Sequence, residues 1–274
     1  MNQNPTPDQF PQTQPPRAPS GNRDYPAGDG TTPPHTVQVA MPNVKPYATY
    51  IILGVTTFVY LLQLAGQYLL NADVVTYFGV KDDTLIRLGE LWRLITPVFL
   101  HASILHIAFN MYALFIFGRG IEARYGHGRF LLLYFLSGYA GNVMSFLLTV
   151  SPSLGASTAI FGLIAAEGVF IIQNRQLLGN RVNRSLMNLL YIAGVNLLIG
   201  FTTPGVDNWG HIGGLLGGFI FAWFGGPRWK LEGFSPSVKL IDEREGHGAF
   251  AGTASVLLFF IPLTALGWIW VVGK

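Results

Sequence analysis

The sequence predicts an all-α membrane protein, a polytopic helical bundle of seven transmembrane helices. Half of the 274 residues are hydrophobic and only 11% are charged, whereas about a quarter of the residues in soluble domains carry charge. Glycine accounts for 33 residues, which is typical of membrane helices that pack closely. Apolar segments near the length of about 20 residues that crosses the hydrocarbon core recur along the chain. Together these three observations exclude an ordinary soluble domain.

The amino-terminal region, residues 1–44, differs in composition from the rest of the chain. It is dense in Pro, Gln, Asn, Gly and Thr and holds hardly an apolar cluster. Such a segment buries too little surface to offset its ordering entropy, so we expect a disordered, proline-rich cytoplasmic tail. Two roles fit this tail. Its prolines could present a polyproline ligand to a partner, but a passive solvated tail fits the composition better. Residues 45–228 then form the predicted core, and residues 229–274 a cytoplasmic linker with the seventh helix.

Seven apolar segments predict the membrane-spanning helices in order. Backbone polar groups in lipid need hydrogen-bond partners within the segment, so each span is expected to be helical. The fifth and sixth spans are short, and a tight turn signal, residues 203–207, separates them. The spans are predicted over residues 47–70, 94–118, 130–150, 154–173, 185–203, 208–226 and 249–272.

The distribution of lysine and arginine predicts the orientation of these spans. Thirteen cations fall in the tail and in alternate loops on one side of the membrane, and four fall on the other side. Because cytoplasmic loops carry the excess of cations, we expect a cytoplasmic amino terminus, an external carboxyl terminus and a bacterial plasma membrane as the location. The cations stand singly between apolar runs, so we expect no nucleic-acid partner. The absence of cysteine excludes disulfides, thiol chemistry and Cys-ligated metals.

Four polar side chains lie within the predicted spans, where each one is costly: His106, Asn110, Ser157 and His211. The predicted topology places all four in the outer half of the bundle, on three different helices. Each has an ordinary explanation, because a serine can bond its own backbone, a histidine can be a packed residue, and His106 with Asn110 can bond between helices. Their convergence on one level favours a catalytic site instead.

The residues around Ser157 and His211 suit acyl-transfer chemistry. The stretch 155–158, Gly-Ala-Ser-Thr, places the serine among small residues at a helix start. Free backbone amides at such a start are suited to hold an oxyanion. His211, Gly214 and Gly218 share one helical face, so close packing there would bring the imidazole within hydrogen-bond reach of the hydroxyl.

Neither nearby acid fits the third position of a catalytic triad. Glu167 follows the serine by ten residues, about 15 Å along a helix axis, and we expect it to be a structural, neutral carboxyl. Asp207 falls in the loop before His211 and is expected to face water. The pattern therefore predicts a Ser–His dyad. Phe161, one turn below the serine, either stacks on the imidazole or is ordinary packing, and the sequence leaves both open.

Five short motifs between residues 47 and 226 resemble the rhomboid family of intramembrane proteases. They are Trp92-Arg93; His101-Ala102-Ser103-Ile104-Leu105-His106 with Asn110; Glu122-Ala123-Arg124-Tyr125-Gly126; Gly155-x-Ser157; and His211-x-x-Gly214-x-x-x-Gly218. Each motif is weak alone, but their order and their places on the helices are specific. The family often has glycine after the nucleophile and alanine before the base, where this chain has Thr158 and Gly210.

The resemblance implies a six-helix core with the seventh helix outside it. It implies an intramembrane serine endopeptidase in which Ser157 is the nucleophile and His211 the base. It further implies that His106, Asn110 and the amide of Ser157 hold the oxyanion, and Gly155 and Phe161 are expected beside the bound substrate.

The expected substrates are transmembrane segments of other membrane proteins, cleaved near the outer face. No metal or cofactor is required. The alternative is a catalytically silent relative that binds membrane clients without cleaving them. A channel, a transporter or a structural subunit fits the convergent polar set less well. The sequence leaves the oligomeric state open.

Overall fold

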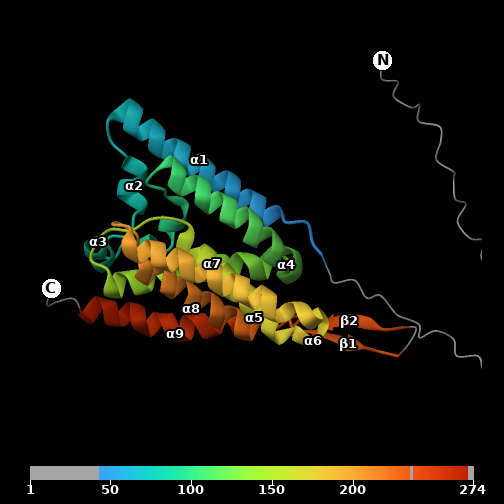
Figure 1. Cartoon of the computed structure of the whole chain (residues 1–274). Helices are drawn as coiled ribbons and strands as arrows, with labels where there is room; N and C mark the ends of the chain where they lie inside the picture. Colours follow the sequence, from blue (N-terminus) through green and yellow to red (C-terminus); the bar gives the residue numbers. More distant parts are fainter. Residues whose placement is uncertain (1–42, 235–236, 271–274) are drawn as a thin grey trace, which may run out of the picture. The chain divides into compact units, whose positions relative to one another are not determined.

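Most of the chain is helical, as the apolar segments predict (Figure 1). A computed structural model describes residues 43–234 and 237–270. The predicted disordered tail therefore lies outside the described residues, except for residues 43–44. The elements are α1 Tyr47–Leu70, α2 Val74–Gly79, α3 Asp83–Arg87, η1 Leu91–Leu94, η2 Thr96–Phe99, α4 Ile104–Leu148, α5 Ser157–Gln173, α6 Arg175–Leu178, η3 Gly179–Arg181, α7 Val182–Thr202, α8 Asn208–Gly225, β1 Trp229–Glu232, β2 Lys239–Asp242 and α9 Gly248–Trp270.

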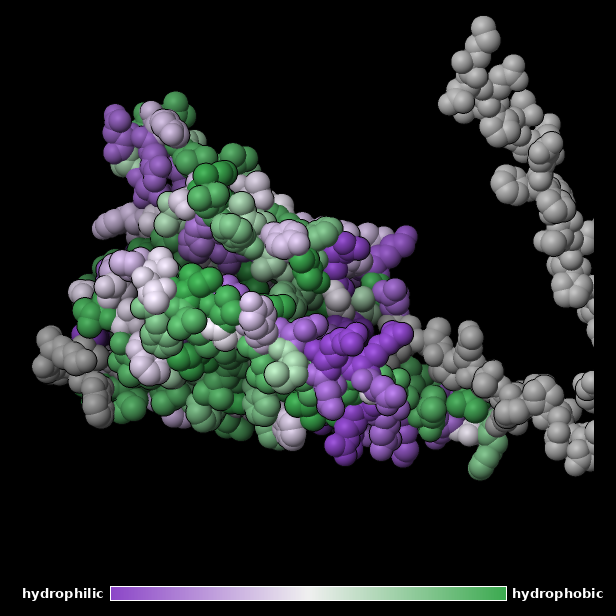
Figure 2. Space-filling view, viewed as in Figure 1, coloured by the Kyte–Doolittle hydropathy of each residue, from purple (hydrophilic) through white to green (hydrophobic). Residues whose placement is uncertain are grey.

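The length and composition of the helices confirm the predicted class, a membrane-embedded helical bundle. Among the described residues, four helical stretches are long and apolar enough to cross a membrane: α1, α4, residues 175–202 and residues 248–269. Helix α5 has only 17 residues, yet most of its side chains are buried because it runs between α4 and α8. Hydrophobic residues cover much of the face in Figure 2, and hydrophilic residues gather at the end that carries α6 and the hairpin.

Helix α4 contains two of the predicted spans, joined at Gly126. This glycine has φ 76° and ψ 164°, which is not helical, so the chain bends there. The first arm begins at Ile104, later than the predicted start at residue 94. Ser103 sets that start, because its Oγ accepts a hydrogen bond from the amide of His106 at 3.2 Å. The ten residues before Ile104 form two short 3₁₀ turns and a loop, which apolar composition alone does not distinguish from a helix.

Glu122 fastens the start of α1 to the bend in α4. Its carboxylate accepts hydrogen bonds from the amides of Ala48 and Thr49 at 2.8 and 2.7 Å and from the hydroxyl of Thr49 at 2.6 Å. The Nδ1 atom of His127 lies 2.5 Å from Oε1 of the same carboxylate, the oxygen that also accepts the amide of Ala48. First-turn amides have no partner within their own helix, so a buried anion satisfies them and also complements the helix dipole. This part of the Glu-x-Arg-x-Gly motif therefore positions α1.

Helix α8 lies against α4 and α5 at the distance that only glycine permits. A Cβ atom added at Gly214 would collide with the carbonyl oxygen of Thr158, and one added at Gly218 would collide with that of Gly162. Both carbonyls belong to the backbone of α5, which cannot swing aside as the tip of a side chain does. Helix α8 packs just as closely against α4, because Cβ atoms added to its glycines there would also collide with atoms of α4. Since lipid tails give apolar helices no hydrophobic reason to associate, this close van der Waals packing holds the bundle together.

The predicted linker before the last helix contains an antiparallel hairpin of β1 and β2, in which Trp229 pairs with Asp242. Strands of four residues show too little alternation to be predicted from the sequence. Asp242 fixes the base of the hairpin, because its Oδ2 accepts a hydrogen bond from Arg129 of α4 at 2.5 Å. Its Oδ1 accepts hydrogen bonds from the backbone amides of Arg228 and Arg244. Helix α9 then returns along α8 and α4 (Figure 1).

The α5–α8 contact predicts a size limit at Gly218. Gly218→Ala should lower the free energy of unfolding by about 1–3 kcal/mol, because the new methyl group meets backbone atoms. Unfolding in mixed detergent micelles measures this change. Gly194→Ala in α7 is the matched control, since a Cβ there has nothing within 4 Å. Equal stability of the two variants would contradict the packing described here.

Candidate active site

Ser157 is the first residue of α5, and the loop before it is fixed at Gly155. The amide of Gly155 donates a hydrogen bond to the carbonyl of Pro97 at 2.9 Å. Gly155 has φ +135°, and a Cβ atom built there would lie 2.9 Å from Nε2 of His106 and 3.5 Å from Oγ of Ser157. Backbone conformation and space both therefore require glycine at this position. The same distances show that the imidazole of His106 lies close to the serine end of α5.

His211 lies within hydrogen-bond distance of the serine. Its Nε2 atom is 2.9 Å from Oγ of Ser157, although the two residues are 54 positions apart in the chain. His211 is on the first turn of α8 and is buried, at 8% exposure. A neutral imidazole with its proton on Nδ1 can accept the hydroxyl proton at Nε2. This arrangement is that of a nucleophile with its general base.

The ring of Phe161 stacks on the imidazole of His211. The two ring centroids are 4.4 Å apart and the planes meet at 13°. Of the two readings that the sequence leaves open, the geometry is that of stacking. Within the described residues, Nδ1 of His211 has no hydrogen-bond partner. The face of Phe161 therefore restrains the orientation of the imidazole, a task that a carboxylate performs in a triad.

The expectation that Asp207 faces water is wrong. Its Oδ1 accepts the amide of Gly210 at 2.9 Å and the hydroxyl of Thr149 at 3.0 Å. It is therefore the N-cap of α8, one turn before His211, and it positions the histidine through the helix start. The described residues also contain no group of three or more His, Asp or Glu side chains that would hold a metal ion.

His106 and Asn110 occupy the first two turns of α4 but differ in their contacts. His106 approaches Gly155 and Ser157, as the glycine geometry above shows. Asn110 is buried, at 7% exposure, and its Nδ2 donates to the carbonyl of His106 at 2.9 Å. The structure therefore brings the imidazole to the serine, while the amide of Asn110 bonds within its own helix.

Glu167 is remote from the dyad, as its spacing predicts, and it has a cationic partner that the sequence does not reveal. Its carboxylate forms an ion pair with the guanidinium of Arg124 on α4. That guanidinium also lies over the ring of Phe170, 4.6 Å from its centroid. These contacts give Glu167 a structural role, which is to join α5 to α4.

Lys81 supports the serine loop, whereas the sequence shows it only as one of the four cations on the outer side. Its side chain is fully buried, and Nζ donates to the carbonyls of Thr149 and Ser151 at 2.7 and 3.3 Å. Nζ also forms an ion pair with Asp83 at 2.7 Å. Its backbone pairs with Ser153 in both directions. Lys81 thereby holds residues 149–153, the segment that leads into Gly155 and Ser157.

Gln63 on α1 supports the opposite wall of the site. Its side-chain oxygen accepts the amide of His101 at 3.1 Å, and its nitrogen donates to the carbonyl of the same residue at 3.3 Å. The buried ring of His101 meets the ring of His106 edge-on, with centroids 5.0 Å apart. The signal in the sequence that points to this support is a glutamine, Gln63, inside an apolar span.

These features define a membrane-embedded helical bundle with a buried serine–histidine pair at the start of one helix. The chain belongs to the rhomboid family, because residues 88–228, just over half of its length, match the Rhomboid domain. This confirms the family that the five motifs suggest.

Three curated relatives are similar to the chain over half or more of its residues. Rhomboid protease GluP of Bacillus subtilis is 40% identical over 180 residues, which cover 66% of this chain and 35% of that protein. RHOMBOID-like protein 9, chloroplastic, of Arabidopsis thaliana is 33% identical over 190 residues, with coverages of 68% and 44%. Rhomboid-like protease 1 of Toxoplasma gondii is 40% identical over 152 residues, with coverages of 54% and 52%. The chain thus spans between about a third and a half of the length of these relatives.

The buried Lys81–Asp83 pair predicts a strong and pH-dependent effect of substitution. Lys81→Met should lower the free energy of unfolding by about 1–3 kcal/mol at neutral pH, because it removes the cation beside a partly buried carboxylate and leaves the carbonyls of Thr149 and Ser151 without their donor. Burial already raises the pKa of Asp83 above its ordinary value of 3.8, and Lys81 opposes that rise. The penalty should therefore be fully present above the raised pKa of Asp83 and shrink as the pH falls towards 3.8.

The double variant Lys81→Met/Asp83→Asn is the control for this prediction. It removes the unpaired charge, so it should recover part of the lost stability and lose the pH dependence. Unfolding measured across this pH range compares the two proteins. A penalty in Lys81→Met that is small, or that does not vary with pH, would count against the ion pair as a support of the serine loop.

Proposed function

We propose that the chain is an intramembrane serine endopeptidase that cleaves transmembrane segments of other membrane proteins. Ser157 is the nucleophile and His211 is the general base. The observation that carries this proposal is the 2.9 Å approach of Nε2 to Oγ in a buried site. Membership in a family whose relatives include named rhomboid proteases supports it. The alternative, a silent relative that only binds membrane clients, has no need of this contact.

The reaction begins with attack of Oγ of Ser157 on the scissile carbonyl carbon while the proton passes to Nε2 of His211. The tetrahedral intermediate carries the negative charge on the former carbonyl oxygen. As it collapses, the C–N bond breaks and the imidazolium donates its proton to the leaving amine. Water then attacks the acyl-enzyme, again with His211 as the base, and releases the carboxylic acid and free Ser157.

Donors around Ser157 are suited to stabilise the oxyanion. Ala156 supplies no side-chain cap to α5, so the first-turn amides of that helix are available to a ligand. The helix dipole adds positive potential at the same point. His106 approaches from α4, and Asn110 would join it by turning its amide away from the carbonyl that it now contacts. In a site with little water these donors count for more than they do in solution.

The membrane position of the dyad supports the proposed substrate class. Ser157 and His211 each lie in the first turn of a helix, so they are near one surface of the membrane, and the distribution of cations favours the outer surface. A peptide bond in an intact helix hides its carbonyl, so helix-weakening residues in a substrate would favour cleavage. In this proposal the amino terminus is cytoplasmic. Residues 1–44 and 229–274 lie outside the proteolytic core, residues 45–228.

Labelling with a fluorophosphonate probe in proteoliposomes tests the assignment of the four residues. Ser157→Ala should abolish labelling and cleavage of a reconstituted transmembrane substrate, because the attacking atom is gone. His211→Ala should reduce labelling nearly as far, because an unassisted serine is a weak nucleophile at neutral pH. His106→Ala and Asn110→Ala should each lower the cleavage rate by about 10²–10³ and leave measurable turnover, since each removes one oxyanion donor.

Helicity and membrane insertion of all four variants serve as the control, because each change should leave the fold intact. Cleavage that persists in Ser157→Ala would disprove the proposed nucleophile. Rates unchanged in both His106→Ala and Asn110→Ala would return those two residues to a packing role and leave the dyad in place.

A further inference from the structure

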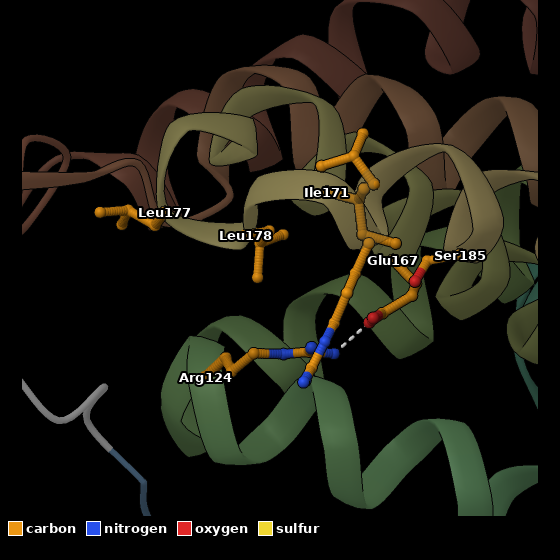
Figure 3. A pocket seen from close by; sticks show the side chains of 8 residues that line it. Arg124, Glu167, Ile171, Leu177, Leu178 and Ser185 are labelled. Atoms are coloured by element: carbon orange, nitrogen blue, oxygen red, sulfur yellow. Dashed lines mark hydrogen bonds and ion pairs between the residues drawn. The ribbon is translucent and has the colours of Figure 1, made fainter.

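A cavity of about 410 Å³ lies between the bend of α4, the second half of α5 and the connection from α6 to α7 (Figure 3). It is distant from the dyad, because Glu167 and Ile171 in its wall are three to four turns along α5 from Ser157. The proposed proteolytic reaction makes no use of it. Its size falls within the range of about 300–1,000 Å³ that is usual for small-molecule sites.

The polar wall of the cavity contains more positive than negative charge. Arg124 and Arg181 face one acid, Glu167, which gives these three residues a net charge of +1. Figure 3 shows the ion pair between Arg124 and Glu167 beside the cavity. Arg181 is exposed, and its guanidinium makes no hydrogen bond or ion pair with another described residue. The guanidinium of Arg124, which also lines the cavity, is held by its ion pair with Glu167 and by the ring of Phe170. Arg181 is therefore the cation in this wall that is available to a ligand, and the positive charge of Arg124 lies beside it.

The other wall of the cavity is apolar. It consists of Ile171 from α5, Leu177 and Leu178 from α6, and Val182 from α7. Leu177, Leu178 and Val182 lie at the start of the apolar stretch 175–202, where a spanning helix meets the membrane surface. A ligand that fits both walls has an anionic group at one end and an apolar body at the other.

We propose that this cavity binds the phosphate headgroup of an anionic phospholipid. Arg181 contacts the phosphate, the guanidinium of Arg124 adds positive charge beside it, and the first carbons of the lipid lie along the leucine wall. Guanidinium groups suit phosphate because their N–H donors match the geometry of its oxygens. Basic pockets between membrane helices are favourable sites for anionic headgroups. Free phosphate meets the same arginines but gains nothing from the apolar wall.

The consequence for the fold lies in α7, which packs weakly. Gly200 is its only buried residue. A lipid held between Arg181 at the start of α7 and Arg124 on α4 would connect this helix to the core. Bound anionic lipid is therefore expected to raise the thermal stability of the protein.

Native mass spectrometry of the detergent-purified full chain with added phosphatidylglycerol tests this site. The native chain should retain one lipid most tightly, and Arg181→Gln should bind that lipid at least about fivefold more weakly, the weight of one cation at a membrane surface. Arg184→Gln is the matched control. It removes the same charge from an exposed arginine three residues further along, outside the cavity wall. It should bind like the native chain and show the same rise in melting temperature with lipid.

Equal loss of lipid in Arg181→Gln and Arg184→Gln would overturn the proposal, because it would indicate a diffuse attraction to surface charge. Phosphatidylcholine bound as tightly as phosphatidylglycerol would also overturn it. Inorganic phosphate is the remaining probe. Displacement of the lipid by millimolar phosphate would identify a simple anion site, whereas retention of the lipid supports the phospholipid.

Discussion

The approach of α8 to α5 is the contact on which the rest of the structure depends. Apolar helices in lipid gain little from burial, so their association rests on close packing, and here glycine allows backbone to meet backbone. Gly214 lies against the carbonyl of Thr158, next to the serine, and one turn from His211. The distance between Nε2 and Oγ is therefore set by the separation of two helix backbones, which side-chain rotation cannot restore. This makes the dyad a property of the fold, even though its two members are far apart in sequence.

Buried polar groups fix the parts of the structure that helix packing leaves free. Lys81 holds the loop before Ser157, Gln63 holds the residue that supports His106, and Glu122 holds the start of α1. A buried polar or charged group is costly unless it has hydrogen-bond or ionic partners. Each of these three groups therefore specifies one arrangement of the segment that it holds. Apolar contacts are non-directional and would leave these loops several alternatives. The end of the bundle that holds Ser157 and His211 is thus built from helices packed on glycine, and buried polar groups fix the loops around them.

Much of this architecture could be predicted from the sequence, because span length and helical faces are local properties. The seven apolar segments, the shared face of His211 and Gly214, and the small residues at Ser157 are visible without a structure. The partners of Lys81 and Glu167 are not, because an ion pair depends on helices distant in sequence. The predicted start of α4 is too early, because apolar 3₁₀ turns resemble a span in composition. The strands of the hairpin β1–β2 are too short to show an alternating pattern. Local patterns therefore locate the candidate site, whereas its supports need the fold.

The most direct test of the link between packing and chemistry is the fluorophosphonate labelling rate of Gly214→Ala, measured per folded molecule. The added methyl group should separate α8 from α5 and move His211 away from Ser157 without touching either residue. If the account is correct, labelling falls at least about tenfold, since the serine loses its base, while Gly194→Ala labels at the native rate. Native labelling in folded Gly214→Ala would show that the dyad does not depend on the glycine contact, and would contradict the central claim.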